Sequence, residues 1–164
     1  MILKREVLKN ALNIISHRPS ADLSIEQYLV TAEILAVQVI NTEAVFRDKK
    51  ILQLGNDDHL SVLFAHHLSC RPFVAELDAR VRTSLKKMYQ KYNIECYDII
   101  EYKTRNILPD SVTADPFYIN PPYSSKNNGK GGKVWTSNVV QASARDSSID
   151  TGRVTLDAAM NTNK

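Results

Sequence analysis

The fold of this chain is decided by the stretch Asp115-Pro-Phe-Tyr-Ile-Asn-Pro-Pro-Tyr123. The apolar triplet Phe-Tyr-Ile inside it predicts the end of a buried strand, and Asn120 stands where that strand stops. Because proline fixes φ and has no amide donor, Pro121 and Pro122 would hold Asn120 and the Pro121 carbonyl in one rigid turn. Tyr123 then offers an aromatic face at the rim of that turn.

The residue types of this turn suit the binding of a planar amine. An amino group on an aromatic ring is a poor nucleophile, because its lone pair is delocalised into the ring. Two acceptors aimed at its hydrogens, the Asn120 side-chain oxygen and the Pro121 carbonyl, would favour a more nucleophilic nitrogen. Tyr123 could stack on the ring. The alternative is a simple proline turn with a core-packing tyrosine, but the combination of residues favours the functional interpretation.

Length and composition indicate one ordinary globular domain. The chain has 164 residues, of which 43% are hydrophobic and 24% charged. We find no apolar run long enough to cross a bilayer and no signal-peptide core at the N-terminus. Cys70 and Cys96 lie far apart in the sequence, so neither a disulfide framework nor a zinc site is expected, and a cytoplasmic location fits. The net charge of +3 is compatible with an anionic partner without requiring one.

Helical and strand-like segments alternate along the chain. Apolar spacing predicts a helix over residues 2–16, and Ser24 with Gln27 predicts a capping box for a second helix. Further helices are predicted over 60–68 and 79–92, and strands over 51–54, 73–75, 94–100 and 112–119. Strands that alternate with helices imply right-handed crossovers and a parallel sheet.

The expected fold class is therefore α/β, a Rossmann-like and mostly parallel sheet with a helical segment before it. Residues 1–46 form the N-terminal helical segment, and residues 47–146 form the domain that binds a cofactor and carries the chemistry. Residues 147–164 are polar and show no periodicity, which predicts a weakly ordered tail.

Polar residues follow the predicted strands, and ligands of open parallel sheets bind beyond the carboxyl ends of the strands. The loop Gly55-Asn-Asp-Asp58 follows the first strand, Asp78 the second and Asn120 the fourth, while Asp98 lies within or just after the third. A carboxylate after the second strand is placed to accept both hydroxyls of a ribose. Asp78 would equally cap the helix that begins at Ala79, and Asp98 alone also fits a solvated turn residue.

These motifs resemble those of a known family. Glu26-Gln-Tyr-x-x-Thr31, Leu54-Gly55, Asp78 and Asn120-Pro-Pro-Tyr123 stand in the same order as in class I S-adenosylmethionine-dependent amino-methyltransferases. The chain is most similar to their Asn-Pro-Pro-Tyr group, which includes adenine-N6 methyltransferases of DNA and RNA. Residues 125–128 are also similar to the small RNA adenine methyltransferases, and the resemblance covers roughly residues 22–135.

The resemblance implies a class I methyltransferase sheet and S-adenosyl-L-methionine as the cofactor, with no metal. It assigns the cofactor contacts to Gln27, Tyr28, Thr31, Gly55, Asn56, Asp57, Asp78 and Asp98. It assigns the binding of the target amine to Asn120, Pro121, Pro122 and Tyr123. Capping and packing are the alternative roles for Gln27, Tyr28 and Thr31.

The loop Leu54-Gly-Asn-Asp-Asp-His-Leu-Ser61 has a single glycine where those methyltransferases usually carry several. It resembles more closely the branched-chain polyamine synthases, aminopropyltransferases that use decarboxylated S-adenosylmethionine. Asp57 and Asp58 would suit their cationic amine substrates, and Tyr97-Asp98 followed by Leu108-Pro109 is also similar. Asn120, however, stands where those enzymes would be expected to carry Asp.

Three functional hypotheses follow. The first is methyl transfer to an exocyclic amine, adenine N6 of DNA or RNA, with nucleic acid bound by the basic loop of Lys126, Lys130 and Lys133. The second is aminopropyl transfer to a polyamine, which predicts an acidic site instead. The third is an inactive binding domain, because the residues after Gly132 are poor in strand-forming types, which predicts an incomplete sheet. The alternative to nucleic-acid binding is that the three lysines lie in a solvated loop without a ligand.

Overall fold

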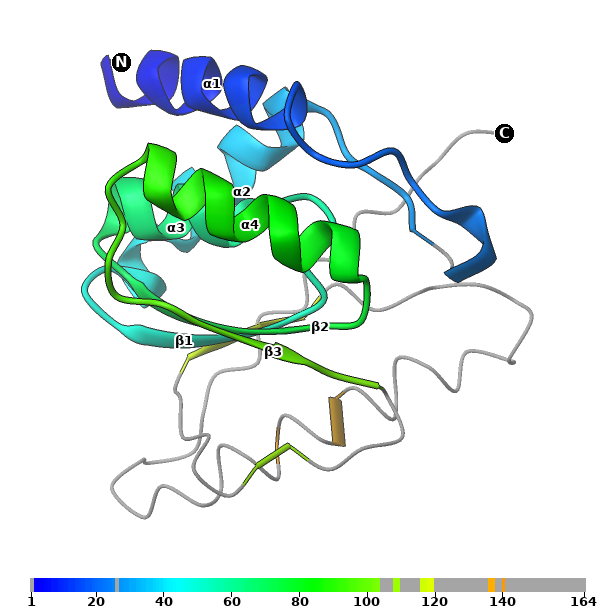
Figure 1. The fold of residues 1–164 in the computed structure, drawn as a ribbon. Helices are drawn as coiled ribbons and strands as arrows, with labels where there is room; N and C mark the ends of the chain where they lie inside the picture. The colour runs from blue at the N-terminus through cyan, green and yellow to red at the C-terminus, as the bar shows by residue number, and fades with distance from the viewer. Residues whose placement is uncertain are drawn as a thin grey trace, which may run out of the picture.

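The computed structural model describes residues 2–25, 27–103, 108–109, 116–119, 136–137 and 140. The elements, in chain order, are α1 (Ile2–Ile15), the 3-10 helix η1 (Leu23–Ile25), α2 (Ala32–Phe46), β1 (Lys50–Leu54), α3 (Leu60–Leu68), β2 (Arg71–Glu76), α4 (Ala79–Lys91), β3 (Asp98–Glu101) and β4 (Phe117–Ile119). These four helices lie on one side of the sheet, with α1 outermost (Figure 1). None of the helices described is long and apolar enough to span a bilayer.

The sheet has the strand order β3-β2-β1-β4, and each neighbouring pair is parallel. The predicted α/β class with a parallel sheet is therefore confirmed. The chain steps from β1 outward to β2 and β3 and then returns to the other side of β1. Ligand crevices of open sheets form where the strand order reverses in this way, so the carboxyl ends of β1 and β4 mark the expected crevice.

Both faces of the sheet are covered by apolar residues. On the helix side, Ile51, Val74 and Tyr118 pack with residues of all four α-helices. The Tyr118 ring meets the Phe64 ring edge to face, at 5.6 Å between centroids. On the other side, Leu52 and Phe117 belong to a second cluster, to which Leu108 also contributes. The predicted buried strand before Asn120 is thus confirmed, since all three residues of β4 are buried.

The start of the second helix was predicted too early. Ser24 lies in η1 and its hydroxyl donates to Asp22, whereas α2 begins after Thr31, whose side chain accepts from the Ile34 amide at 3.5 Å. Gln27 is not a capping residue, because its side-chain oxygen accepts from the Asp22 amide at 2.7 Å. The helix therefore starts at the later threonine, and residues before it contact the loops after β1 and β2, since Gln27 donates to Asp78 and the Val30 amide to Asp58.

Candidate functional site

The turn after β1 is tied to the end of β2. Gly55 has φ 70°, in the left-handed region that favours glycine, and its amide donates to the Ala75 carbonyl at 2.9 Å. The next amide, that of Asn56, donates to the Glu76 carboxylate at 2.6 Å. The first loop is thereby fixed against the neighbouring strand, with a residue that has no side chain at the tightest point.

Glu76 is the carboxylate at the tip of β2. It is the last residue of that strand, is buried, and accepts from the Asn56 amide at one oxygen and from the Asp78 amide, at 2.8 Å, at the other. Burial raises its pKa, which the two amide hydrogen bonds oppose. Glu76 forms no ion pair with the residues described. Sequence reasoning missed it because the second strand was predicted to end at Ala75, one residue too early.

Asp78 caps α4, as the sequence predicted. One of its oxygens accepts from the Arg80 amide at 2.8 Å, and the Arg80 guanidinium pairs with the other at 2.6 Å. The Gln27 side chain donates to that second oxygen at 3.2 Å. The hydrogen bond from Arg80 is the main reason why the pKa of Asp78 is lowered. Two predicted site residues, Gln27 and Asp78, are thus brought into contact, although much of the acceptor capacity of Asp78 is already used.

Asp57 and Asp58 lie in the same loop but have different partners. Asp58 is 5% exposed, pairs with Arg18 at 2.7 Å and accepts from the Val30 amide at 2.8 Å. Asp57 forms no ion pair among the described residues. Burial, followed by the charges of Asp58 and Glu76, raises the pKa of Asp57 to about 7. Burial also raises the pKa of Asp58, against the opposing effects of Val30 and Arg18.

A network of buried hydrogen bonds fixes the loop that follows β1. Gln53 donates to the Asn56 side-chain oxygen at 2.8 Å, and the Asn56 amide group donates to the Ser61 hydroxyl. Ser61 in turn shares a hydrogen bond of 2.5 Å with Tyr89, which is fully buried. These hydrogen bonds fix the position of the Asn56 side chain, although the buried side-chain oxygen of Gln53 has no hydrogen-bond partner among the described residues. Asn56, predicted as a cofactor residue, therefore has a clear role in shaping the loop.

The three predicted site residues that precede α2 differ in their exposure to solvent. Gln27 is buried against Asp78, but Tyr28 is 64% exposed and Thr31 is the exposed cap of α2. The capping role that was the alternative for Thr31 is confirmed. The cofactor contacts that the resemblance assigns to these three residues stay predictions.

Asp98 lies within the third strand, which is one of the two predicted positions, and its contact with the cofactor stays a prediction. Asp98 begins β3, where it lies opposite Phe73 in the middle of β2, and it faces Arg71 at 3.7 Å. The carboxyl end of β3 is instead formed by Glu101, opposite Glu76. The third strand starts later than residues 94–100 predicted, so Asp98 lies short of the edge at which Gly55 and Asp78 meet.

Asn120, Pro121, Pro122 and Tyr123 lie outside the described residues, as do Lys126, Lys130 and Lys133. The strand that leads into them is described. Ile119, the last residue of β4, lies opposite Leu54, the last residue of β1. The chain therefore enters the Asn-Pro-Pro-Tyr segment at the same edge of the sheet as the Gly55 turn.

The described part of this strand-tip edge, defined by Asp57, Asp58, Glu76 and Asp78, is acidic. Arg18 pairs with Asp58 and Arg80 with Asp78. Asp57 and Glu76 have no such cation among the described residues, and both have raised pKa values. Desolvated carboxylates without a counter-ion bind a cation favourably, because the cation removes the cost of their burial.

Comparison with known proteins identifies the family. Residues 6–129 match the model of the branched-chain polyamine synthase A C-terminal domain. The chain belongs to this family. The resemblance of its first loop to branched-chain polyamine synthases is thereby confirmed. A search of curated proteins finds no significant match.

Solved structures confirm the fold. The branched-chain polyamine synthase from Thermus thermophilus, in complex with N4-aminopropylspermidine and 5'-methylthioadenosine, matches with a TM-score of 0.69 and 21% identity. That match covers 83% of this chain and 40% of the synthase. The C9 mutein of the same enzyme gives a TM-score of 0.63 and 23% identity over 70% of this chain and 34% of the mutein. This chain therefore aligns with well under half of these relatives.

A methyltransferase-like fold is also confirmed. A protein from Pyrococcus horikoshii, provisionally assigned as an RNA methyltransferase, matches with a TM-score of 0.68 and 13% identity. The match covers 84% of this chain and 68% of that protein. The architecture is thus shared by synthases and methyltransferases, while membership of the Asn-Pro-Pro-Tyr group stays a prediction.

Proposed function

We propose that this chain transfers an aminopropyl group from decarboxylated S-adenosylmethionine to an amine. The observation that carries this proposal is a pair of carboxylates at the strand tips, the buried Glu76 and the half-buried Asp57, which have no counter-ion among the described residues. The family supports it, since the solved synthases of similar fold hold an aminopropylated polyamine and 5'-methylthioadenosine.

The residues at the edge fit an adenosyl sulfonium cofactor. Glu76 ends the second strand, where a carboxylate can accept both hydroxyls of a ribose. Each Glu76 oxygen accepts one backbone amide and has further acceptor capacity, whereas the Asp78 oxygens bind the charged side chain of Arg80. Gly55 presents bare backbone beside it. Gln27 stands next to Asp78 at the border of the same edge.

Charge separates the two candidate cofactors. S-adenosylmethionine has a carboxylate beside its ammonium group, whereas the decarboxylated form has only the ammonium and the sulfonium charges. A site whose carboxylates lack counter-ions attracts the decarboxylated cofactor and repels the carboxylate group of S-adenosylmethionine. At an effective dielectric constant of about 20, one such charge pair several Å apart is worth a few kcal/mol before screening.

When bound, the cofactor supplies a carbon activated by its positive sulfur, and transfer breaks one carbon–sulfur bond, forms one carbon–nitrogen bond and releases a neutral thioether and a proton. The chain's own contribution is to position and deprotonate the acceptor. With a pKa of about 7, the Asp57 carboxylate is matched to take a proton from an ammonium acceptor near neutral pH. Asn120 and the Pro121 carbonyl would hold the acceptor nitrogen.

Methyl transfer from S-adenosylmethionine to adenine N6 of DNA or RNA is the second candidate. The observation that favours it is the sequence Asn120-Pro-Pro-Tyr123 directly after β4, where polyamine synthases would be expected to carry Asp. A neutral amide is a better partner for an uncharged aromatic amine than for a cationic polyamine.

Product analysis distinguishes these candidates. The protein is incubated with either cofactor and with spermidine or an adenine-containing oligonucleotide, and the products are separated by mass spectrometry. We expect 5'-methylthioadenosine and an aminopropylated amine from the decarboxylated cofactor. S-adenosylhomocysteine with methyladenine would establish the second candidate instead, and binding of neither cofactor in calorimetry would support the inactive-domain hypothesis.

A further inference from the structure

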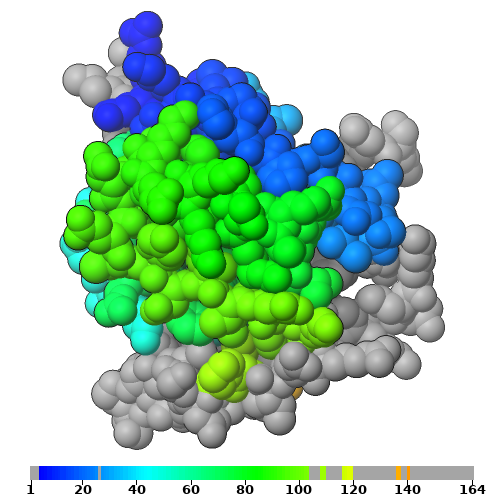
Figure 2. Space-filling model, in the orientation of Figure 1, coloured from blue at the N-terminus to red at the C-terminus, as the bar shows by residue number. Residues whose placement is uncertain are grey.

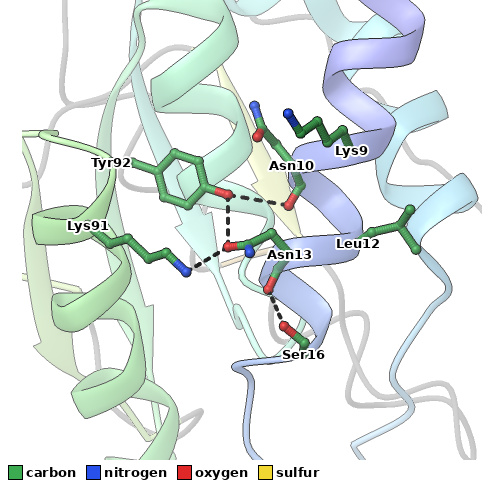
Figure 3. A pocket seen from close by; sticks show the side chains of 7 residues that line it. All are labelled: Lys9, Asn10, Leu12, Asn13, Ser16, Lys91 and Tyr92. Atoms are coloured by element: carbon green, nitrogen blue, oxygen red, sulfur yellow. Dashed lines mark hydrogen bonds between the residues drawn. The ribbon is translucent and has the colours of Figure 1, made fainter.

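A shallow groove of about 540 Å³ runs between α1 and α4. Its polar lining residues are Lys9, Asn10, Asn13, Ser16, Lys91 and Tyr92. Figure 3 shows the lysines on opposite walls, one on each helix, with the asparagine side chains between them. None of the lining residues is acidic.

Hydrogen bonds between the two helices hold this α1–α4 groove in shape. The Lys91 ammonium donates to the Asn13 side-chain oxygen at 2.8 Å, and the Tyr92 hydroxyl lies 3.4 Å from the Asn10 carbonyl. Further along, the Ser84 hydroxyl donates to the His17 carbonyl at 3.1 Å. As the residue number rises along α1, the number of its contact on α4 falls, so the two helices are antiparallel.

Cations extend along both walls beyond the groove. Residues four apart share a helix face, which places Arg5 beside Lys9 on α1 and Lys87 beside Lys91 on α4. None of these four side chains forms an ion pair with the residues described. Glu6 is the single acidic residue in the sequence of α1, and α4 contains none. The result is a row of exposed positive charges on two antiparallel helices.

The groove is remote from the strand-tip edge. Asp78 caps the first turn of α4, whereas Lys91 is the last residue of that helix. At 1.5 Å per residue the two ends lie about 20 Å apart. Figure 2 shows α1 and α4 side by side on one face of the molecule. The cations of this face are therefore not needed to neutralise the acidic site.

We propose that the α1–α4 groove binds the phosphodiester backbone of a single-stranded nucleic acid. A row of cations matches a ligand with regularly repeated negative charges, and amide and hydroxyl groups between the cations suit contacts to phosphate and sugar. Arg5 and Lys9 on α1 and Lys87 and Lys91 on α4 together provide four cations, which is more than one phosphate group would use. A membrane surface fits less well, because binding there needs an apolar face and Leu12 is the single exposed apolar side chain that lines the groove.

Fluorescence anisotropy tests this proposal. The full chain is titrated into a labelled single-stranded RNA of about 15 nucleotides, at roughly 50 and 200 mM salt. The double variant Lys9→Glu/Lys91→Glu should bind about tenfold more weakly or worse, and its salt slope should fall by about 1.4, from two lost contacts of about 0.7 each. Lys49→Glu, an exposed lysine before β1 and outside the groove, should bind within about twofold of the wild type.

The single variant Lys9→Glu separates a loss of binding from a loss of structure. Lys9 is exposed and makes no hydrogen bond to the described residues, whereas Lys91 donates to Asn13. It should weaken RNA binding about threefold or more while the thermal unfolding midpoint stays unchanged. The proposal is overturned if the wild type does not bind RNA, if Lys49→Glu weakens binding as much as Lys9→Glu, or if vesicles of phosphatidylserine bind the chain and RNA does not. None of these readouts depends on the transfer reaction.

Discussion

The strand-tip edge and the α1–α4 groove use charge in opposite ways. At the edge, Glu76 is buried and Asp57 is half-buried, and desolvation raises the pKa values of both carboxyl groups. In the groove, Lys9 and Lys91 are exposed, and the Lys91 ammonium donates to the side-chain oxygen of Asn13. Buried charges cost free energy and interact strongly at short range, whereas exposed charges cost little and are screened by salt.

This difference indicates which ligands the two regions suit. A small cation that enters the acidic edge can relieve the desolvation of specific carboxylates, so binding there should depend on pH and on the ligand's exact charge. A polyanion in the groove gains from many weak contacts, so binding there should depend on salt. Each prediction below tests one side of this contrast.

The largest expected effect is on stability, from removing Asp58. Its ion pair with Arg18 has side chains only 7% and 11% exposed, so Asp58→Ala would leave a buried guanidinium with the Val30 carbonyl but without its charged partner. We expect a loss of about 3–5 kcal/mol in the free energy of unfolding, measured by urea denaturation. Glu43→Ala, which breaks the exposed pair with Arg47, should cost about 0.5 kcal/mol or less. Equal losses in the two variants would contradict the contrast between buried and exposed charge.

Asp57→Asn should change how stability depends on pH. The pKa of Asp57 is raised from 3.8 to about 7 on folding, so the unfolded chain releases this proton first as pH rises. The contribution of Asp57 to stability therefore falls between about pH 4 and pH 7 and is constant above that range. Over this pH range, the contribution of Asp57 to the free energy of unfolding changes by at most about 4 kcal/mol.

Asparagine keeps the shape of the side chain and removes the charge. Asp57→Asn should thus be more stable than the wild type above pH 7 and nearly equal to it at pH 4, as followed by urea denaturation across that range. Parallel pH profiles for the two proteins would show that Asp57 ionises normally in the folded state. Asp57→Asn should also bind a cationic cofactor more weakly than the wild type. Unchanged affinity would show that the Asp57 carboxylate does not contact the cofactor.

Asn120→Ala tests the part of the site that follows β4. If the amide holds the acceptor nitrogen, transfer should slow by about 10²–10³-fold, the usual effect of removing one preorganised polar group. Cofactor affinity, measured by calorimetry, should stay within about twofold, because Asn120 is assigned to the acceptor. A rate near that of the wild type would remove Asn120 from the mechanism under either candidate reaction.

Sequence reasoning succeeded where the determinants are local. The apolar run from Leu60 to Leu68 marked α3 with its observed bounds, and the alternation of elements was enough for the parallel sheet. It failed where a contact across the chain decides the outcome. Gln27 was interpreted as a cap but binds Asp78, 51 residues away.

The errors at the edge have a related cause. Glu76 was overlooked, and Asp98 lies at the start of β3 and not near its carboxyl end, because both positions depend on where β2 and β3 begin and end. Strand bounds are set by pairing with neighbouring strands, which a single sequence does not display. Glu76 could have been found from its position as the first carboxylate after the apolar run that ends at Ala75.

The most direct test of the acidic strand-tip edge is a calorimetric comparison of decarboxylated S-adenosylmethionine with S-adenosylmethionine, using the wild type and Glu76→Gln. We expect the wild type to bind the decarboxylated form about tenfold more tightly or better, a difference of about 1.4 kcal/mol. Glu76→Gln should weaken both cofactors and reduce that preference, whereas Glu43→Gln, far from the edge and exposed, should do neither. Equal affinity of the wild type for the two cofactors, or a preference for S-adenosylmethionine, would contradict the assignment of this edge to a dicationic ligand.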